Sequence, residues 1–261
     1  MIAIKSLHEI EKMKVAGRIA GAALRDAGRA VGPGITTAEL DEIVRTCIES
    51  MGAKPAFLGY GGFPASACVS VNEQVIHGIP NRKTVLREGD LVKIDVGACK
   101  DGYNGDCAAT FGVGKISDEA KRLIRVTREC FFEAMKVAKP GYRISDMSSA
   151  IQTYAEAAGY GVVRKYVGHG VGAKLHEDPE VPNYRTAGKG PRLTPGMTLA
   201  VEPMINAGTP DVLTLKDGWC VVTADGKLSA HYENSILITN DEPFILTDNG
   251  EGTIIAEEMC E

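Results

Sequence analysis

The chain has 261 residues, of which 44% are apolar and 24% are charged, and its formal net charge is −5 at pH 7. This apolar content supports one large buried core or two small ones, and it excludes an intrinsically disordered chain. The near balance of acids and bases argues against a dedicated nucleic-acid-binding protein, because such a protein carries a basic face or stripe. We therefore expect a globular protein without a nucleic-acid partner.

The sequence shows no pattern of export or membrane insertion. No apolar run approaches the ~20 residues of a membrane span, and the amphipathic N-terminus is charged from Lys5 onward, unlike the core of a signal peptide. The seven cysteines are an odd number without a Cys-x-x-Cys spacing, which argues against a disulfide framework and a zinc–thiolate site. We expect a soluble, cytoplasmic chain with reduced thiols and no membrane partner.

Two amphipathic helices are predicted at the start of the chain. The capping-box patterns Ser6-x-x-Glu9 and Thr36-x-x-Glu39 open apolar repeats of helical spacing. These helices are expected over residues 6–30 and from residue 36 to Gly52. Strand-like runs follow over 67–71, 74–80, 91–98 and 107–111, and the last two are joined by a turn at 100–102.

The same order of elements recurs in the second half of the chain. Helices are expected over residues 117–138 and from Ser145 to about Gly159. The strands expected after them cover 162–168, 197–205, 218–223 and 231–238. The second half therefore repeats the helix–helix–strand order of the first.

A constant offset supports this internal repeat. Matched positions lie 107 residues apart: Pro33-Gly34 and Pro140-Gly141, Gly52 and Gly159, Gly89 and Gly196, and Asp95 and Glu202. We therefore expect one compact domain over residues 1–261, built from two similar halves at about 1–112 and 113–261. The alternative is that the order of elements recurs by accident.

Two acids of the first half are predicted to lie close together. Asp95 interrupts the apolar strand 91–98, and a turn centred between Lys100 and Asp101 would place Asp106 directly opposite it. Directly opposed residues have Cβ atoms about 4.5–5.5 Å apart on one face of a sheet. Two buried carboxylates at that distance stay ionised only with a cation between them. The alternative is a solvated hairpin tip with two unrelated acids.

Three further residues complete a candidate metal site. Glu202 and Glu233 each enter an otherwise apolar strand, and His169 stands between two glycines, which allow close backbone approach. With Asp95 and Asp106 they offer four carboxylates and one imidazole, which match the charge of two divalent cations. Such donors favour Mn, Fe, Co or Zn at two sites roughly 3.5–4 Å apart, with a bridging water.

Five stretches resemble the motifs of type I methionine aminopeptidases: GYGGFPASACVSVNEQVIHGIP, KIDVGACKDGYNGDCAATF, YVGHGVGAKLHEDP, AVEPM and HYENSILIT. The resemblance spans the chain, in order and at the spacing of the family. It implies the pita-bread fold, an α+β fold in which two pseudo-symmetric α/β halves share a central curved antiparallel sheet with helices on its outer face. It also implies hydrolytic removal of the N-terminal methionine from nascent proteins and peptides whose second residue is small.

The resemblance implies how the metal site and catalysis are organised. Two divalent ions (Co, Mn, Fe, Zn or Ni) would be held by Asp95, Asp106, His169, Glu202 and Glu233. Asp106 and Glu233 would bridge the two ions, and Glu202 would also act as general base. His77 and His176 would face the substrate as catalytic and substrate-binding residues rather than as metal ligands.

The resemblance also implies a pocket for the methionine side chain. Its walls would be Phe57, Tyr60, Phe63, Cys68, Leu175 and Trp219. Aromatic rings and a thiol suit a polarisable thioether, although for Phe57 and Leu175 ordinary core packing is an equal alternative. His231, two residues before Glu233, is expected to be either a plain strand residue or a residue that tunes the metal ligands.

The lengths of its segments indicate which form of the family the chain resembles. Only 25 residues separate His176 from Glu202, too few for the helical insertion of type II enzymes. No zinc-finger extension is expected ahead of residue 1, so the chain resembles the minimal bacterial form. We expect a monomer that acts on nascent-chain N-termini and associates transiently with the ribosome.

Two functions other than that of an aminopeptidase make different demands on the sequence. A pita-bread domain that only binds peptides or proteins would show substitutions in the acid set, and here all five positions are present. A di-metal phosphoesterase would need basic clamps for phosphate, and only Lys93 and Lys100 stand near the acids.

Overall fold

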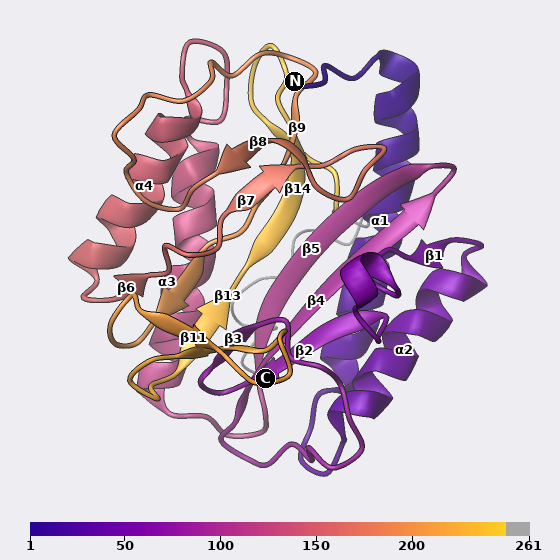
Figure 1. Ribbon diagram of the computed structural model, residues 1–261, viewed down its shortest axis with the longest axis vertical. Helices are drawn as coiled ribbons and strands as arrows, with labels where there is room; N and C mark the ends of the chain where they lie inside the picture. The colour runs from indigo at the N-terminus through magenta and orange to yellow at the C-terminus, as the bar shows by residue number, and fades with distance from the viewer. Residues whose placement is uncertain (249–261) are drawn as a thin grey trace.

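The structure is a computed structural model that describes residues 1–248 (Figure 1), and the four helices in that part lie at the predicted positions. Their bounds are α1 (Leu7–Ala30), α2 (Thr37–Ser50), α3 (Asp118–Met135) and α4 (Ile144–Ala157). The predicted capping boxes close the starts of α1 and α2, where Ser6 and Thr36 accept the backbone N–H of Glu9 and Glu39. Six cysteines are free thiols, and Cys260 lies outside the described residues.

An antiparallel sheet of nine strands crosses the molecule in the order β1-β4-β5-β14-β9-β7-β8, with β2 on β4 and β15 on β14. Its strands are β1 (Lys54–Pro55), β2 (Ala67–Val71), β4 (Leu91–Lys100), β5 (Tyr103–Gly112), β7 (Gly168–Gly170), β8 (Glu177–Val181), β9 (Thr198–Val201), β14 (Glu233–Leu237) and β15 (Phe244–Ile245). Strands from both halves of the chain therefore form one sheet, joined where β5 pairs with β14.

Two small sheets adjoin the nine-stranded one, in the orders β13-β10-β6 and β11-β12-β3. Their strands are β3 (Gln74–Ile76), β6 (Gly161–Val162), β10 (Met204–Asn206), β11 (Val212–Thr214), β12 (Val221–Thr223) and β13 (Ser229–His231). A short 3₁₀ helix covers Tyr60–Gly62. In the described part of the chain no helix has the length and apolarity that a membrane crossing requires.

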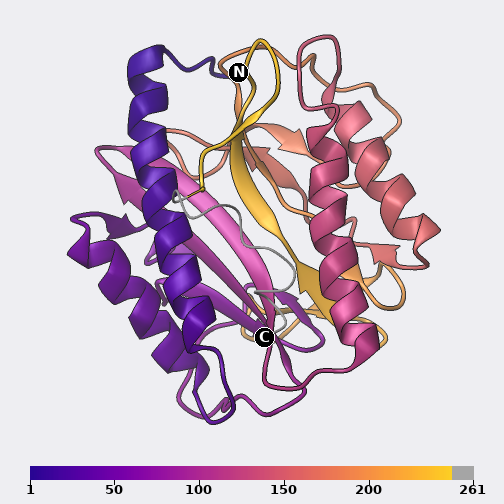
Figure 2. The same ribbon diagram turned by 180° about the vertical axis from the view of Figure 1, so that it is seen from behind.

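All four helices cover one face of the central sheet and leave the other face open (Figure 2). Helix α1 packs on β4 and β5, and α3 packs on β5, β10 and β13. Gly105 permits the close approach of β5 and α1, since a Cβ there would lie 2.5 Å from the Gly17 Cα. The main core fills the space between helices and sheet, so the expected placement of the helices is confirmed.

The β4–β5 hairpin corrects one predicted pairing. Asp106 lies opposite Gly97, and Asp95 lies opposite Ala108, so the two acids are diagonal neighbours rather than directly opposed. The turn has a two-residue loop, Asp101-Gly102, with φ of 49° and 81°. Both loop residues have the positive φ of a type I′ hairpin turn, which moves the centre of the turn one residue beyond the predicted one. The two acids nevertheless share a face, because that shift changes the pairing by two residues.

Two predicted strands are split where the chain changes sheets. The strand expected over 197–205 becomes β9 and β10, interrupted at Glu202 and Pro203, and Pro203 has no N–H to donate to a sheet. The strand expected over 231–238 divides between β13 and β14 at Tyr232. Glu202 therefore lies where the chain leaves the central sheet and enters the small sheet β13-β10-β6.

Three other predicted strands are shorter than expected. The one expected over 74–80 ends at Ile76, before His77 with its positive φ of 58°. Most of 162–168 is a connection, because after Val163 the chain leaves the small sheet and joins the central one at Gly168. The strand expected over 218–223 begins only at Val221. The Asp217 carboxylate accepts the N–H groups of Trp219 and Cys220 and holds these two residues in a turn.

Candidate active site

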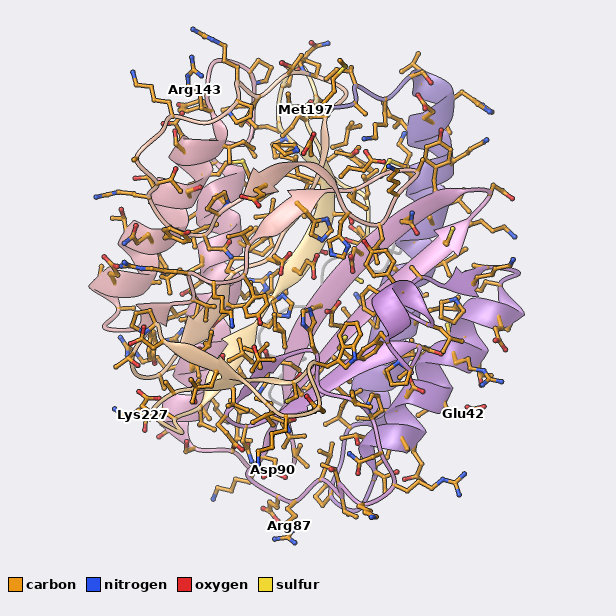
Figure 3. All side chains as sticks on the ribbon, viewed as in Figure 1. Glu42, Arg87, Asp90, Arg143, Met197 and Lys227 are labelled. Carbon is orange, nitrogen blue, oxygen red and sulfur yellow. The ribbon has the colours of Figure 1, made fainter. Side chains whose placement is uncertain are left out.

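The alternation of β4 separates the core from the open face. Ile94 and Val96 belong to the core under the helices, so Asp95 between them faces the other side of the sheet. Figure 3 shows charged residues such as Glu42 and Lys227 at the edge of the molecule, pointing away from the sheet. The acids of the open face are therefore distinct from the ordinary charged surface.

The residues that could bind a metal ion lie in two rows across the sheet. The first row crosses β4, β5 and β14 and ends at Glu202, in the break between β9 and β10. Asp95 on β4 lies opposite Ala108 on β5, and Ala108 lies opposite Glu233 on β14. The pairs before and after the break in β9–β10 keep one register, which places Glu202 opposite Glu233. Three carboxylates thus share one row, with the small Ala108 between two of them.

The second row lies two residues along each strand, on the same face. Asp106 on β5 lies beside Ser235 on β14, and Ser235 pairs with Ala200 on β9. Ala200 in turn pairs with His169 on β7. This row adds one carboxylate and one imidazole, so four strands (β4, β5, β7 and β14) and the break after β9 supply five donors in two adjacent rows.

The donor atoms of these rows converge. One oxygen each of Asp106 and Glu233 and one nitrogen of His169 lie within 4.8 Å of one another. The His169 Nε2 is 3.9 Å from the Asp106 Oδ2 and 3.7 Å from the Glu202 Oε1. The His169 Nδ1 contacts the Gly170 carbonyl at 2.9 Å, and since a carbonyl only accepts, Nδ1 carries the hydrogen. The Nε2 lone pair therefore points at the carboxylates, as in a metal-binding histidine.

Burial dominates the electrostatics of the cluster. It raises the pKa of all four carboxyl groups, to about 7 for Asp106, and nearby acids raise the pKa of Asp95, Glu202 and Glu233 further. Burial, followed by the neighbouring His176, lowers the pKa of His169 to about 4, so its imidazole is neutral. Four acids and a neutral imidazole in one buried place are stabilised by cations.

The residues present fit divalent metal ions. Oxygens of Asp95, Asp106 and Glu233 are buried without a hydrogen-bond partner in the described part of the chain. Buried carboxylate oxygens need a donor or a cation. The mixture of carboxylates with imidazole suits divalent transition metals.

A cavity of about 230 Å³ opens beside the cluster. Its walls hold every residue that the sequence analysis assigned to the metal site, the catalytic pair and the methionine pocket: Phe57, Tyr60, Phe63, Cys68, His77, Asp95, Asp106, His169, Leu175, His176, Glu202, Trp219 and Glu233. The structure brings all of them together, while their individual roles stay predictions.

The apolar end of this cavity is a small cluster separate from the main core. Phe57, Phe63, Cys68 and Leu175 are buried in it, and Trp219 packs against it with its ring at 5.1 Å from that of Phe63. Gly97 makes room for this wall, because a Cβ there would lie 2.6 Å from the Phe57 ring. Phe57 and Leu175 therefore combine the two expected alternatives, since both line the cavity and both are packed in a buried cluster.

Two histidines stand at the edge of the cavity. The His176 ring is tilted by 51° against that of His169, with centroids 4.1 Å apart, and its Nδ1 lies 2.8 Å from the Tyr60 hydroxyl. His77 has a positive φ of 58° and meets the ring of Tyr166 edge to face. Burial, then the neighbouring His176, lowers the pKa of His77 to about 4, so this imidazole is neutral.

Three residues of the cavity wall, Ile76, Tyr166 and Val167, were not predicted from the sequence. Ile76 precedes His77 in its motif, and Tyr166 and Val167 open the motif that holds His169, so these neighbours were the available signal. His231 is buried, and its Nε2 lies 3.9 Å from Glu202 and 3.7 Å from Glu233. Its position two residues before Glu233 led to the two expected alternatives, a plain strand residue or a residue that tunes the metal ligands, and the structure places it beside those ligands.

The chain is similar along most of its length to known metallopeptidases. The chain matches the model of metallopeptidase family M24 over residues 11–240. A methionine aminopeptidase of Clostridium acetobutylicum is 53% identical over 247 residues, which cover 95% of this chain and 99% of that protein. Methionine aminopeptidase 1 of Bacillus subtilis is 51% identical, with the same coverage of both chains.

Solved structures confirm the expected pita-bread fold. The methionine aminopeptidase of Thermotoga maritima has a TM-score of 0.93 at 48% identity, covering 95% of this chain and 99% of its own. The prolidase of Pyrococcus furiosus has a TM-score of 0.77 at 26% identity, covering 94% of this chain and 65% of its own. Because the family model matches most of its length and its relatives match it nearly end to end, the chain belongs to metallopeptidase family M24.

Proposed function

We propose that this protein is a methionine aminopeptidase, which hydrolyses the bond after an N-terminal methionine when the second residue is small. The observation that carries the proposal is one cavity with two unlike ends. Carboxylates and His169 form one end, and Phe57, Phe63 and Trp219 form the other. The catalytic unit is the single domain of residues 1–261, with halves at about 1–112 and 113–261.

The two ends of the cavity suit the two ends of a methionine residue. Aromatic rings and the Cys68 thiol favour an apolar, polarisable thioether. The end that would hold the two metal ions would take the free α-amine in its neutral form, and only the first residue of a chain has that amine. This arrangement limits the reaction to N-termini and accounts for an exopeptidase.

Five donors imply two divalent ions, with Co, Mn, Fe, Zn or Ni as candidates. Asp95, Asp106, His169, Glu202 and Glu233 would hold them. When bound, such a pair lowers the pKa of a water molecule to near neutrality and polarises the scissile carbonyl. The relatives' names support this substrate class, since the proteins of Clostridium acetobutylicum and Bacillus subtilis are called methionine aminopeptidases.

The remaining chemistry belongs to side chains. Glu202 accepts the proton of the attacking water and passes it to the leaving amine. The His176 Nδ1 lies 2.8 Å from the Tyr60 hydroxyl. In the tautomer with the hydrogen on Nε2, the Tyr60 hydroxyl donates to Nδ1, and the Nε2–H donates to the scissile carbonyl oxygen as its charge grows. Neutral His77 accepts the N–H of the second substrate residue. Each role needs a donor or acceptor that the cavity wall provides.

The partners follow from the substrate. We propose that the protein acts as a cytoplasmic monomer on nascent-chain N-termini and meets the ribosome transiently. His176 lines the cavity and is exposed, so an extended chain would enter on its side.

The test is methionine release from Met-Ala-Ser and Met-Gly-Ser peptides by metal-free protein titrated separately with Mn²⁺, Fe²⁺, Co²⁺ and Zn²⁺. We expect release with at least one metal, and little release from Met-Ile-Ser, whose second residue is bulky. Ala-Pro is the control substrate, because prolidases share the fold. Absence of methionine release with every metal, or faster cleavage of Ala-Pro, would contradict the proposal.

A further inference from the structure

His231 has an unusual environment for a buried histidine. It is the last residue of β13 and is 1% exposed, and neither ring nitrogen has a hydrogen-bond partner in the described part of the chain. Its backbone is fixed, because the Thr110 hydroxyl accepts its N–H and donates to its carbonyl, both at 2.8 Å. A buried polar side chain without partners in a rigid frame points to a missing ligand.

The internal repeat shows what this position corresponds to. Glu202 follows Asp95 by 107 residues, whereas Ser235 follows Thr110 by 125 and His231 follows Asp106 by the same 125. The Ser235 hydroxyl contacts the backbone N–H and carbonyl of Asp106, each at 2.9 Å, as Thr110 does for His231. His231 therefore occupies in the second half the place that Asp106 occupies in the first.

The distances agree with a metal ion better than with a hydrogen bond. The His231 Nε2 lies 3.7 Å from the Glu233 Oε2 and 3.9 Å from the Glu202 Oε2. These distances exceed those of a hydrogen bond. Donors held at about 2.0–2.2 Å from a common ion lie about 3–4.3 Å apart, depending on the angle between them.

Donor atoms of His231, Asp95 and Glu233 also form a group of their own. They lie within 4.8 Å of one another, as do those of His169, Asp106 and Glu233. Each group has one imidazole, and Glu233 belongs to both. The two groups are thus similar halves of one centre.

We propose that His231 is a sixth protein ligand of the metal centre, binding through Nε2 the ion that Asp95 and Glu233 hold. Each ion then has one imidazole, His169 on one side and His231 on the other. This inference rests on the proposed two-metal site and adds a ligand to it.

The test is proton NMR of the protein loaded with two equivalents of Co²⁺. A coordinated imidazole gives a strongly shifted, exchangeable N–H resonance that disappears in D₂O. We expect two such resonances in the wild type and one in His231→Gln, with binding of the second Co²⁺ ion weakened by more than the factor of about 10–100 that is typical when a residue that only orients a ligand is lost. His169→Gln should lose the other resonance, and the matched control His77→Gln should keep both.

A second measurement does not depend on the folding of a variant. Wild-type protein with ¹⁵N-labelled histidine, titrated with Zn²⁺, should show two imidazoles whose Nε2 signals move to the range of metal-bound nitrogen. Two bound ions with one coordinated imidazole would overturn the assignment of His231 and leave the proposed function intact. A protein that binds no Co²⁺ or Zn²⁺ would overturn both.

Discussion

The two halves of the central sheet place their acids differently. On the β4–β5 hairpin of the first half, Asp95 and Asp106 are diagonal, opposite Ala108 and Gly97. Across β9 and β14 of the second half, Glu202 lies opposite Glu233 in one continuous register. The first hairpin turns in two residues, whereas the second half extends through β10 and β13 before it returns.

This difference is useful because it spreads the donors over two rows. Facing pairs in both halves would put all four acids in one line, whereas the diagonal pair moves Asp106 into the row of His169. Small residues then make room between the donors, with Ala108 between Asp95 and Glu233, and Ala200 beside His169. Two rows with small residues between them can enclose two ions rather than one.

Removing the donor that sets the second row should have the largest effect. Asp106→Asn should lose metal and activity together, to the background of the peptide assay, because an amide cannot supply two anionic oxygens to a pair of ions. Metal content by elemental analysis and methionine release from Met-Ala-Ser check this. Asp101→Asn, in the turn of the same hairpin, is the control, and retention of both metals by Asp106→Asn would refute the two-row arrangement.

Removing a residue beside the rows should affect turnover alone. His176→Ala should keep its metals, since every proposed ligand remains, yet kcat should fall by about 10²–10³, as for the loss of one oxyanion donor. KM should change much less, because that contact strengthens only in the transition state. The exposed His8→Ala is the control. A defect confined to KM, or lost metal, would show that His176 has another role.

The two hydroxyls at the junction of the halves should matter equally. Ser235→Ala and Thr110→Val each leave a buried N–H and carbonyl without a partner, at Asp106 and His231 respectively. Each should lower the free energy of unfolding by about 1–3 kcal/mol. Denaturant unfolding of both variants beside Thr110→Ser, which keeps its hydroxyl, measures this. A large loss in one half and none in the other would contradict the equivalence.

The buried acids should also make the metal-free protein less stable to heat as the pH rises. The folded pKa of Asp106 is about 7 against an ordinary 3.8, so this group stabilises the fold below pH 3.8 and loses that effect as pH rises through 7. The melting temperature with chelator should therefore fall between pH 5 and 7.5, at about 2–4 °C per kcal/mol. Saturating Mn²⁺ should remove or reverse this slope, because it binds the ionised carboxylates. Equal slopes with and without Mn²⁺ in calorimetry would contradict the cause.

Local patterns predicted what depends on local structure. The capping boxes at Ser6 and Thr36 start helices where expected, and the alternation around Asp95 gave the right face. The pairing partner of Asp106 was wrong by two residues, because the predicted centre of the turn lay one residue too early. The dipeptide Asp101-Gly102 itself favours a two-residue type I′ loop, so the correct centre of the turn was available from the sequence.

Long-range pairing lies beyond such patterns. That β14 joins β5 and not another edge follows from packing between segments over 100 residues apart, which no spacing along the chain encodes. The same applies to His231, whose nearness to Glu202 depends on the change of sheet at Pro203. The residue types of the site were predictable, but the rows that assemble them were not.

Anomalous diffraction from crystals grown with Mn²⁺ tests the two-row arrangement most directly. We expect two peaks about 3.5–4 Å apart, one against His169 and Glu202, the other against Asp95, with Asp106 and Glu233 between them. A single peak in the cavity, or peaks only outside it, would contradict a two-metal centre built from these rows.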